Sequence, residues 1–461
     1  MDQLLIIAVT CVLGGLVVLA MSYMARRLLN SASDEVENDE SSEPTGTKNG
    51  PTTTQNVKKS AKVNKTASSD HRPTGDYTHE WLASNLKGHS RPVLDLDFAC
   101  NGKFLVTCSD DGGLILWSCK DIAQRDHKTS RGNIDLDHAD LIRFGPDSKS
   151  MFVHLARADT LAVYRLVKRE GASNVYRFEH VESVEFTKEH TRDISHIGFA
   201  CNGHFFMSAS SDAKLVVYDI KGTTLHSWET KQSALYHAAV SHCGRFVAAS
   251  GFTPDVKVFD VCFDRSGNFK EVKSAFQLKG HNSGVYSFDF NQDSKRMLTA
   301  SKDGTWRYWD TDIRYAQGEE PVPLFTSEWD QLRSAKPSRV RCALAADGCS
   351  FAIAIGLQLR LYEVPTDKKS TEFWYRTISD VYAANSVDAL SAVRFSTDNL
   401  LLCLSGDKHV RVLHNVAGYR AQLAALARQR LKPQGDAHAR RIDESIVELR
   451  GRLKEIGIRL D

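Results

Sequence analysis

The sequence predicts an all-β fold, a seven-bladed β-propeller, with a transmembrane helix before it and an α-helical tail after it. Three observations predict this: an internal repeat spaced at about 50 residues, an uncharged apolar run near the N-terminus, and an apolar seam near the C-terminus. We expect an anchor over 1–27 with its span at 4–25, a disordered polar tether over 28–76, the propeller over 77–415, and a helical hairpin or short coiled-coil tail over 416–461.

Charge and cysteine content narrow the class of protein. The 461 residues include 59 Lys+Arg and 57 Asp+Glu, so the net charge of +2 creates no overall attraction for nucleic acid. The 10 cysteines never form a Cys-x-x-Cys pair, which excludes a small disulfide scaffold and a Cys-rich zinc module. Their scatter along the chain suits a reducing compartment.

The anchor is predicted from Leu4–Ala25, a run of 22 residues without charge. As a helix it would be about 33 Å long, enough to cross a hydrocarbon core of about 30 Å. A cleaved signal peptide is the alternative, but the apolar run is longer than usual and no basic segment precedes it. Arg26 and Arg27 follow the span directly, so the positive-inside rule places the rest of the chain in the cytosol.

The tether over 30–76 contains no Leu, Ile, Phe, Trp or Tyr, and therefore buries too little apolar surface to offset its ordering entropy. An acidic block lies within 34–43 and a lysine block within 48–65. We interpret both as parts of a solvated tether rather than as a docking site. Asn64 begins a glycosylation sequon that is usable only if the tether is luminal.

Seven β-rich runs end alike, with an aromatic or apolar residue followed by a polar one. These ends are Trp117-Ser118, Tyr164-Arg165, Tyr218-Asp219, Phe259-Asp260, Trp309-Asp310, Tyr362-Glu363 and Leu413-His414. Successive ends lie 47, 54, 41, 50, 53 and 51 residues apart. This spacing accommodates four short strands and their loops, which is one propeller blade.

The fifth unit shows the pattern most clearly. The pair Gly280-His281 precedes an alternating strand over 285–290, which we expect to be half-buried. A strand over 296–301, a turn containing Asp303-Gly304 and a strand that closes at Trp309-Asp310 follow. Similarly, the stretch 81–86 precedes the first Gly-His pair and predicts an outer strand that completes the seventh blade and closes the ring.

These residues resemble the WD-repeat family, in which a Trp, a Ser or Thr, a His and an Asp form a buried hydrogen-bonded tetrad within a blade. By spacing, three units carry this set: His89, Thr107, Asp111 and Trp117; His190, Ser208, Asp212 and Tyr218; and His281, Thr299, Asp303 and Trp309. We expect the second tetrad to be altered, because a phenol does not reproduce the indole N–H donor.

The other four units are degenerate. Ala158, Thr253 and Gly356 replace the acid in three of them, and the last keeps Asp407 but has Cys403 in place of the hydroxyl. A Ser/Thr–His–Asp set also suggests a hydrolase, but it recurs at fixed offsets and lacks a Gly-x-Ser-x-Gly elbow. Metal, phosphate-loop and dinucleotide motifs are absent from the sequence. We therefore predict a non-enzymatic protein without cofactor or metal.

In the tail, Pro433-Gln434-Gly435 separates two predicted helices, and Asp436 is the predicted N-cap of the second. The apolar residues Ile442, Ile446, Leu449, Leu453, Ile456 and Leu460 form an a/d seam in the second helix. We interpret the tail as a hairpin folded on itself or against the propeller, with self-association through the seam as the alternative. Its basic residues give a weak signal for RNA or lipid contact.

Four stretches, 119–138, 243–263, 278–312 and 414–420, resemble a membrane-anchored branch of the WD-repeat family, and the anchor, tether and tail match its layout. The resemblance implies an endoplasmic-reticulum membrane protein that scaffolds stress signalling, the unfolded protein response, near the stress-sensing translation-factor kinase of that membrane.

We therefore predict a membrane-tethered scaffold that presents a propeller surface to protein partners at the cytosolic face of the endoplasmic reticulum. In WD-repeat proteins, contacts commonly come from the positions after the opening His and before the turn Asp. Here those positions are Arg91, Arg192, Ser283, Asp110, Ser211 and Lys302. The alternatives are a luminal or secreted propeller adaptor, and an RNA-binding propeller with steep salt dependence.

Overall fold

The computed structural model describes residues 77–124, 126–169, 171, 175–365, 373–379, 381–382, 390–431 and 435–457. The predicted anchor and tether, including Arg26, Arg27 and Asn64, lie outside these residues, as does Leu460. Within the described part of the chain, no helix combines the length and the apolar character needed to span a bilayer.

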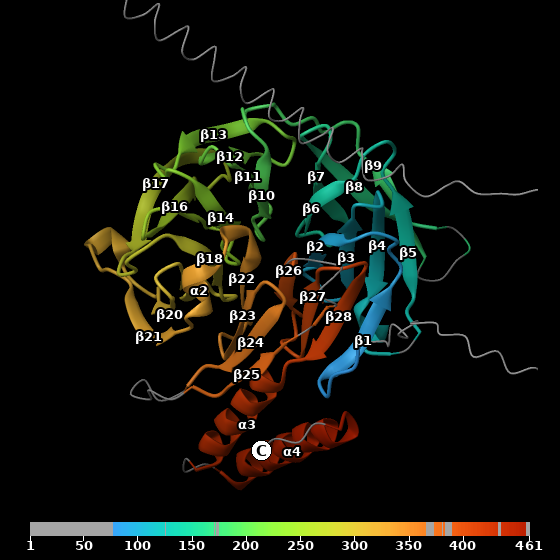
Figure 1. Cartoon of the computed structure of the whole chain (residues 1–461), viewed down its shortest axis with the longest axis vertical. Helices are drawn as coiled ribbons and strands as arrows, with labels where there is room; N and C mark the ends of the chain where they lie inside the picture. Colours follow the sequence, from blue (N-terminus) through green and yellow to red (C-terminus); the bar gives the residue numbers. More distant parts are fainter. Residues whose placement is uncertain are drawn as a thin grey trace, which may run out of the picture. The chain divides into compact units, whose positions relative to one another are not determined.

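Seven four-stranded antiparallel sheets confirm the predicted seven-bladed β-propeller (Figure 1). Blades 1 to 3 consist of β2 Val93–Phe98, β3 Phe104–Ser109, β4 Gly113–Ser118, β5 Thr129–Asn133; β6 Ala139–Phe144, β7 Ser150–Leu155, β8 Thr160–Lys168, β9 Tyr176–His180; and β10 Ile194–Phe199, β11 Phe206–Ser210, β12 Lys214–Tyr218, β13 Thr224–Glu229. Blades 4 and 5 consist of β14 Leu235–Val240, β15 Phe246–Gly251, β16 Val256–Phe263, β17 Phe269–Leu278; and β18 Val285–Phe290, β19 Arg296–Ser301, β20 Thr305–Asp310, β21 Val322–Glu328. Blades 6 and 7 consist of β22 Val340–Leu344, β23 Ser350–Ile355, β24 Gln358–Glu363, β25 Tyr375–Ile378; and β26 Ala392–Phe395, β27 Leu401–Ser405, β28 His409–His414, β1 Leu82–Lys87. Short helices join some of these strands: η1 Cys119–Asp121, η2 Tyr315–Gln317, α2 Gln331–Ser334 and η3 Pro337–Arg339.

The blades form a closed ring. The first strand of each blade lies innermost and contacts the first strand of the next blade, and β26 of blade 7 contacts β2 of blade 1 (Figure 1). The predicted closure is confirmed, because β1, from the start of the array, pairs antiparallel with β28 from its end. Strand β1 therefore covers the edge of β28 and links the two ends of the strand array.

The inner strand β18 differs from its prediction. Its alternating pattern suggested one buried face, yet all six residues of Val285–Phe290 are buried. Each blade packs against a neighbour on both faces, so the second face of an inner strand is covered by the adjacent sheet.

Polar side chains on the inner strands bind backbone groups of the next blade. Asp97 accepts the N–H of Phe144 at 2.8 Å, and Asp289 accepts the N–H of Leu344 at 2.8 Å. The N–H groups of an inner strand that face the ring axis have no partner in their own sheet, so these carboxylates satisfy them. The charges around the ring axis thus have a structural role that the sequence did not reveal.

The tail forms two helices, α3 Val416–Leu431 and α4 Asp436–Glu455, and α3 contacts β23 and β24 of blade 6 (Figure 1). Asn415 precedes α3, and its Oδ1 accepts the N–H of Gly418 at 3.0 Å, which caps the helix. Helix α4 begins with Gly435, not the predicted Asp436, in the N-cap position.

The apolar seam of α4 is used within the chain. Leu453 is 3% exposed and belongs to a core cluster of blades 6 and 7, against which Leu449 and Ile456 also pack. Ile442 is 4% exposed. The hairpin folded against the propeller therefore describes the tail, and these seam residues are not free for a coiled coil between chains.

Candidate protein-interaction face

Each blade exposes loops at two ends. We call one end the upper face: it carries the turns between second and third strands, such as Asp110, Ser211 and Lys302, and the loops that lead into first strands, such as Arg91 and Arg192. The lower face carries the turns between first and second strands. The opening His and the turn Asp of each tetrad lie beneath the upper face, so the tetrads position its loops.

The fifth blade has a complete tetrad. Thr299 Oγ1 accepts the indole N–H of Trp309 at 2.8 Å and lies 2.8 Å from His281 Nε2. His281 Nδ1 lies 3.0 Å from Asp303 Oδ2, which also accepts the backbone N–H of Asn282 at 2.9 Å. Because the Asp303 carboxylate can only accept, the neutral imidazole donates from Nδ1 to Asp303, and its Nε2 accepts the Thr299 hydroxyl.

The first blade repeats this geometry. Thr107 Oγ1 accepts the indole N–H of Trp117 at 3.0 Å and lies 2.8 Å from His89 Nε2, and His89 Nδ1 lies 3.2 Å from Asp111 Oδ1. The glycine before the histidine is needed in blade 5, because Gly280 has φ +137°, a backbone conformation that residues with a Cβ rarely adopt.

The pKa shifts of Asp303 and His281 are consistent with the hydrogen bonds of the fifth-blade tetrad. Burial alone would raise the pKa of the Asp303 carboxyl, but hydrogen bonds from His281, Thr305 and the backbone N–H of Asn282 lower it below its usual range. Burial also lowers the pKa of His281, and the neighbouring carboxylate offsets only part of this shift. The tetrad therefore joins a neutral imidazole to an ionised carboxylate at neutral pH.

The third blade has an altered set. His190 Nε2 lies 2.6 Å from Ser208 Oγ, and Ser208 Oγ lies 3.3 Å from the phenol oxygen of Tyr218. His190 Nδ1 is buried without a hydrogen-bond partner among the described residues, and Asp212 binds Thr191 Oγ1 at 2.8 Å instead. The sequence predicts that the phenol of Tyr218 alters this tetrad. The hydrogen bond that is missing is instead the one between His190 Nδ1 and Asp212.

Two degenerate blades contain substitutes that sequence reasoning missed. In blade 2 the tetrad hydroxyl is replaced by His154, which is 2% exposed and lies 2.6 Å from Asp140 Oδ1 and 3.2 Å from Asp159 Oδ1. In blade 4 the Gln232 side chain accepts both the N–H and the hydroxyl of Thr253. His154 lies ten residues before Tyr164, so the tetrad offset could have found it.

The buried tetrads cannot act on a substrate. The hydroxyls that a hydrolase would use belong to Thr107, Ser208 and Thr299, and all three residues are 0% exposed. Their lone pairs and protons are already engaged within the blade. Among the described residues, no group of three or more His, Cys, Asp or Glu is arranged to hold a metal ion.

The structure places the six predicted contact residues on the upper face, with different surroundings. Arg91 Nη1 donates to Asp110 Oδ2 at 2.8 Å, with the side chains 63% and 36% exposed, so these two residues bind each other. Arg192, Ser211 and Lys302 are exposed, whereas Ser283 is half-buried. The carbonyl groups of Arg192 and Ser283 accept the hydroxyls of Ser210 and Ser301, each at 3.0 Å.

Two exposed apolar residues on the same face were missed. Leu136, in the loop between β5 and β6, is 93% exposed, and Phe252, in the turn between β15 and β16, is 60% exposed. Leu136 has φ +63°, a strained conformation for this residue. Asp137 fixes the loop by accepting the backbone N–H groups of Arg157 and Ala158, each at 3.0 Å. A leucine between two aspartates in a loop was the available sequence signal.

This fold, with its buried tetrads, defines a β-propeller of the WD-repeat class. The family model described as WD domain, G-beta repeat, matches residues 80–118, 181–219 and 272–310. Each match spans one predicted tetrad and ends one residue after its closing aromatic residue. The chain is 38% identical over 382 residues to transducin beta-like protein 2 of Homo sapiens, covering 83% of this chain and 82% of that protein. The mouse protein of the same name is 37% identical over 381 residues, covering 83% of each chain. The chain therefore belongs to the transducin beta-like protein 2 family. A more distant similarity, 25% over 136 residues, is to the guanine nucleotide-binding protein subunit beta of Saccharomyces cerevisiae, covering 30% of this chain and 28% of that protein.

Proposed function

We propose that the protein is a non-enzymatic scaffold that captures protein partners on its upper face, with Leu136 as an apolar anchor. The observation that carries this proposal is a 93% exposed leucine in a strained backbone conformation, held in place by the hydrogen bonds of Asp137. An exposed apolar side chain on a pre-ordered loop lowers the entropy cost of binding and gains free energy when a partner covers it. Arg192 and Lys302 supply exposed positive charge on the same face.

The test compares partner capture by full-length variants purified from cells, with each co-purified protein quantified by mass spectrometry. Leu136→Asp and the triple variant R91A/R192A/K302A should lose the same partners without a fall in melting temperature. Ile220→Asp is the matched control for the first, because Ile220 is 53% exposed in the lower-face turn between β12 and β13. Partners retained by both upper-face variants would overturn the assignment.

The same proposal places the propeller at the cytosolic face of the endoplasmic-reticulum membrane, tethered by residues 4–25. The support is the 22-residue uncharged run, the following Arg26 and Arg27, and the family resemblance. Protease treatment of intact microsomes, with the propeller and a tag on Met1 detected separately, tests it. A digested propeller with unglycosylated Asn64 fits the proposal, and a protected propeller favours the luminal adaptor.

As partner we propose the stress-sensing translation-factor kinase of that membrane, which rests on the family resemblance alone. Loss of kinase capture in Leu136→Asp, with capture kept in Ile220→Asp, is the expected result. Self-association and RNA binding are the competing proposals. Sedimentation tests the first, and a steep fall of oligonucleotide affinity with salt would reveal the second.

A further inference from the structure

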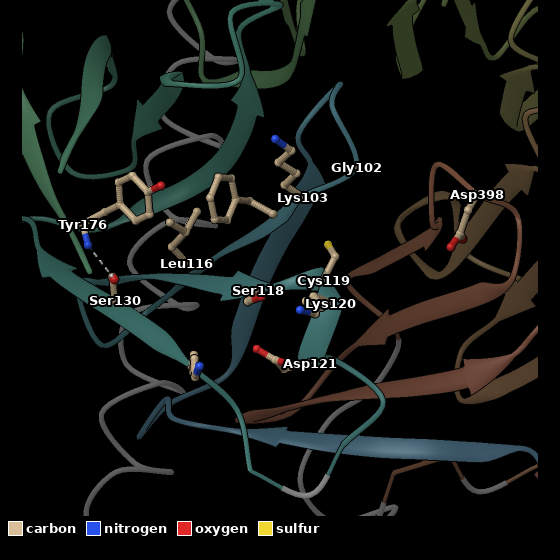
Figure 2. Close-up of a pocket in the computed structure, with 12 residues that line it drawn as sticks. Gly102, Lys103, Leu116, Ser118, Cys119, Lys120, Asp121, Ser130, Tyr176 and Asp398 are labelled. Atoms are coloured by element: carbon tan, nitrogen blue, oxygen red, sulfur yellow. Dashed lines mark hydrogen bonds between the residues drawn. The ribbon is translucent and has the colours of Figure 1, made fainter. Parts of the chain in front are cut away.

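A pocket of about 590 Å³ opens on the lower face at blade 1 (Figure 2). Its lining includes Lys103 and Phe104 at the start of β3, Leu116 in β4 and Lys120 in η1. Asp110 lies at the opposite end of β3, so this pocket is separate from the upper face. Neighbouring blades contribute Tyr176, from β9 of blade 2, and Asp398, from the turn between β26 and β27 of blade 7.

The floor of the pocket is apolar and fixed. The rings of Phe104 and Tyr176 meet edge to face, with centroids 5.3 Å apart and planes at 75°. The backbone N–H of Tyr176 donates to Ser130 Oγ at 3.0 Å, which ties blade 2 to blade 1 at this point (Figure 2). Leu116 lies beside these rings and is 3% exposed. An apolar floor that already exists before binding is typical of a ligand site.

Three lysines surround this floor, and none of them pairs with the two aspartates, Asp121 and Asp398, that also line the pocket. Lys103, Lys120 and Lys128 line the pocket and are exposed, and within the described residues none of their ammonium groups makes an ion pair or a hydrogen bond. Some lysines elsewhere on the propeller do form ion pairs, as Lys295 does with Asp312 at 3.0 Å. The carboxylate of Asp398 is engaged locally, accepting the Ser396 hydroxyl at 2.5 Å and the Leu400 N–H at 3.0 Å.

We infer that this pocket binds a short acidic peptide segment of a protein partner, with an apolar side chain of that segment on the Phe104–Tyr176 floor. Carboxylates of the segment would face the three unpaired lysines, and the apolar side chain would displace water from the rings. Asp121 and Asp398 also line the pocket. Their free carboxylate oxygens can accept backbone N–H groups of a peptide, which a sugar-phosphate backbone does not offer. This site goes beyond the proposed function, because it lies on the other face.

The probe is a blocked fluorescent peptide, Glu-Asp-Leu-Phe-Asp-Glu, titrated against the full-length chain by fluorescence anisotropy. We expect K103Q/K120Q/K128Q to raise its Kd about tenfold or more, because each lysine contributes a charge contact. The matched control is K149Q/K221Q/K270Q, which removes the same charge from exposed lysines outside the pocket and should leave Kd within about twofold.

The apolar floor gives an independent test. Y176A should weaken binding, and Y176F should restore it, because the ring rather than the hydroxyl forms the floor. Melting temperatures identify any variant that fails to fold. If the lysine variants fail to fold, the Tyr176 variants test the inference, and the reverse also holds. Equal weakening by both lysine triples, or none by either, overturns the inference. Binding of oligouridylate is the result that would favour RNA instead. The inference is wrong if K103Q/K120Q/K128Q abolishes that binding and the acidic peptide does not compete with it. Leu136→Asp should bind the peptide normally, so failure of the upper-face proposal is distinguishable.

Discussion

The guanidinium of Arg411 donates to the side-chain oxygen of Asn85 at 2.9 Å, across 326 residues of sequence. The contact joins the first strand of the described chain to the last strand of the propeller, next to the backbone ladder between β1 and β28. The same guanidinium donates to the carbonyl of Val381 at 3.3 Å and lies over the rings of Tyr77 and Tyr382, 5.1 and 4.9 Å from their centroids. Ring closure therefore rests on a buried cation as well as on strand pairing.

Replacing Arg411 with alanine should lower the free energy of unfolding by about 3 kcal/mol, because the carbonyl and amide groups around it lose a buried partner. Urea denaturation of the full-length chain measures this. Arg452→Ala is the control, since Arg452 pairs with Glu448 on exposed helix surface, and it should cost less than about 0.5 kcal/mol. Similar losses in both variants would show that Arg411 does not secure the closure.

The two types of tetrad should respond differently when the closing aromatic residue loses its polar group. Trp309→Phe removes the indole N–H from Thr299 and leaves space in a fully buried site, so we expect a cost of about 3 kcal/mol. Tyr218→Phe removes a hydroxyl whose contact with Ser208 is 3.3 Å long, and should cost about 0.5 kcal/mol. Thermal unfolding of both variants measures the two losses of stability. Equal losses would contradict the difference between the two tetrads.

The altered tetrad should make the protein sensitive to mild acid. Burial lowers the pKa of His190 from 6.5 to about 4, so folding favours its neutral form. Its contribution to stability is fully present above pH 6.5 and is lost as the pH falls toward 4. His190→Gln should therefore flatten the fall of melting temperature between pH 6.5 and 4.

His154 provides the opposite case for comparison. Burial would lower its pKa, but hydrogen bonds and charge from Asp140 and Asp159 raise the pKa above 6.5. Its contribution is fully present below pH 6.5 and is lost as the pH rises through the raised folded-state value. His154→Gln should change the slope of melting temperature with pH on the neutral to alkaline side only. A change at the acid end for His154→Gln would contradict this assignment.

The repeat spacing predicted the ring because closing residues such as Trp309 recur at intervals that only a fixed structural unit maintains. The same periodicity predicted the pairing of β1 with β28, since a blade lacking its outer strand needs one from elsewhere. Contacts between blades were not predictable in this way. Asp97 bonds to the N–H of Phe144 through a juxtaposition that depends on how two sheets pack, and no local pattern encodes it.

Some residues of the candidate sites were likewise predictable from the sequence, and others were not. Positions such as Lys302 follow from offsets within a repeat, so the sequence could place them on the upper face. Leu136 lies in a loop outside the repeat pattern, and its exposure depends on the fixed turn around Asp137. The lower pocket combines Phe104, Tyr176 and Asp398 from three blades, and only the closed ring brings them together.

The tail gives the last prediction. Leu453, which is 3% exposed, anchors α4 to the core cluster of blades 6 and 7, whereas Val447 on the same helix is 70% exposed. Leu453→Ala should destabilise docking of α4 by about 3 kcal/mol, because it leaves a cavity in a buried cluster. Arg430 of α3 pairs with Asp443 of α4 at 2.9 Å, so a detached α4 would leave the end of α3 unsupported and free to unwind. Trypsin cleavage at Arg428 and Arg430 should then accelerate by about tenfold or more, while Val447→Ala should leave it unchanged. Sedimentation gives the mass of each variant under the same conditions. If the seam joined two chains instead, Leu453→Ala would halve the mass without faster cleavage, and the intramolecular role would be wrong.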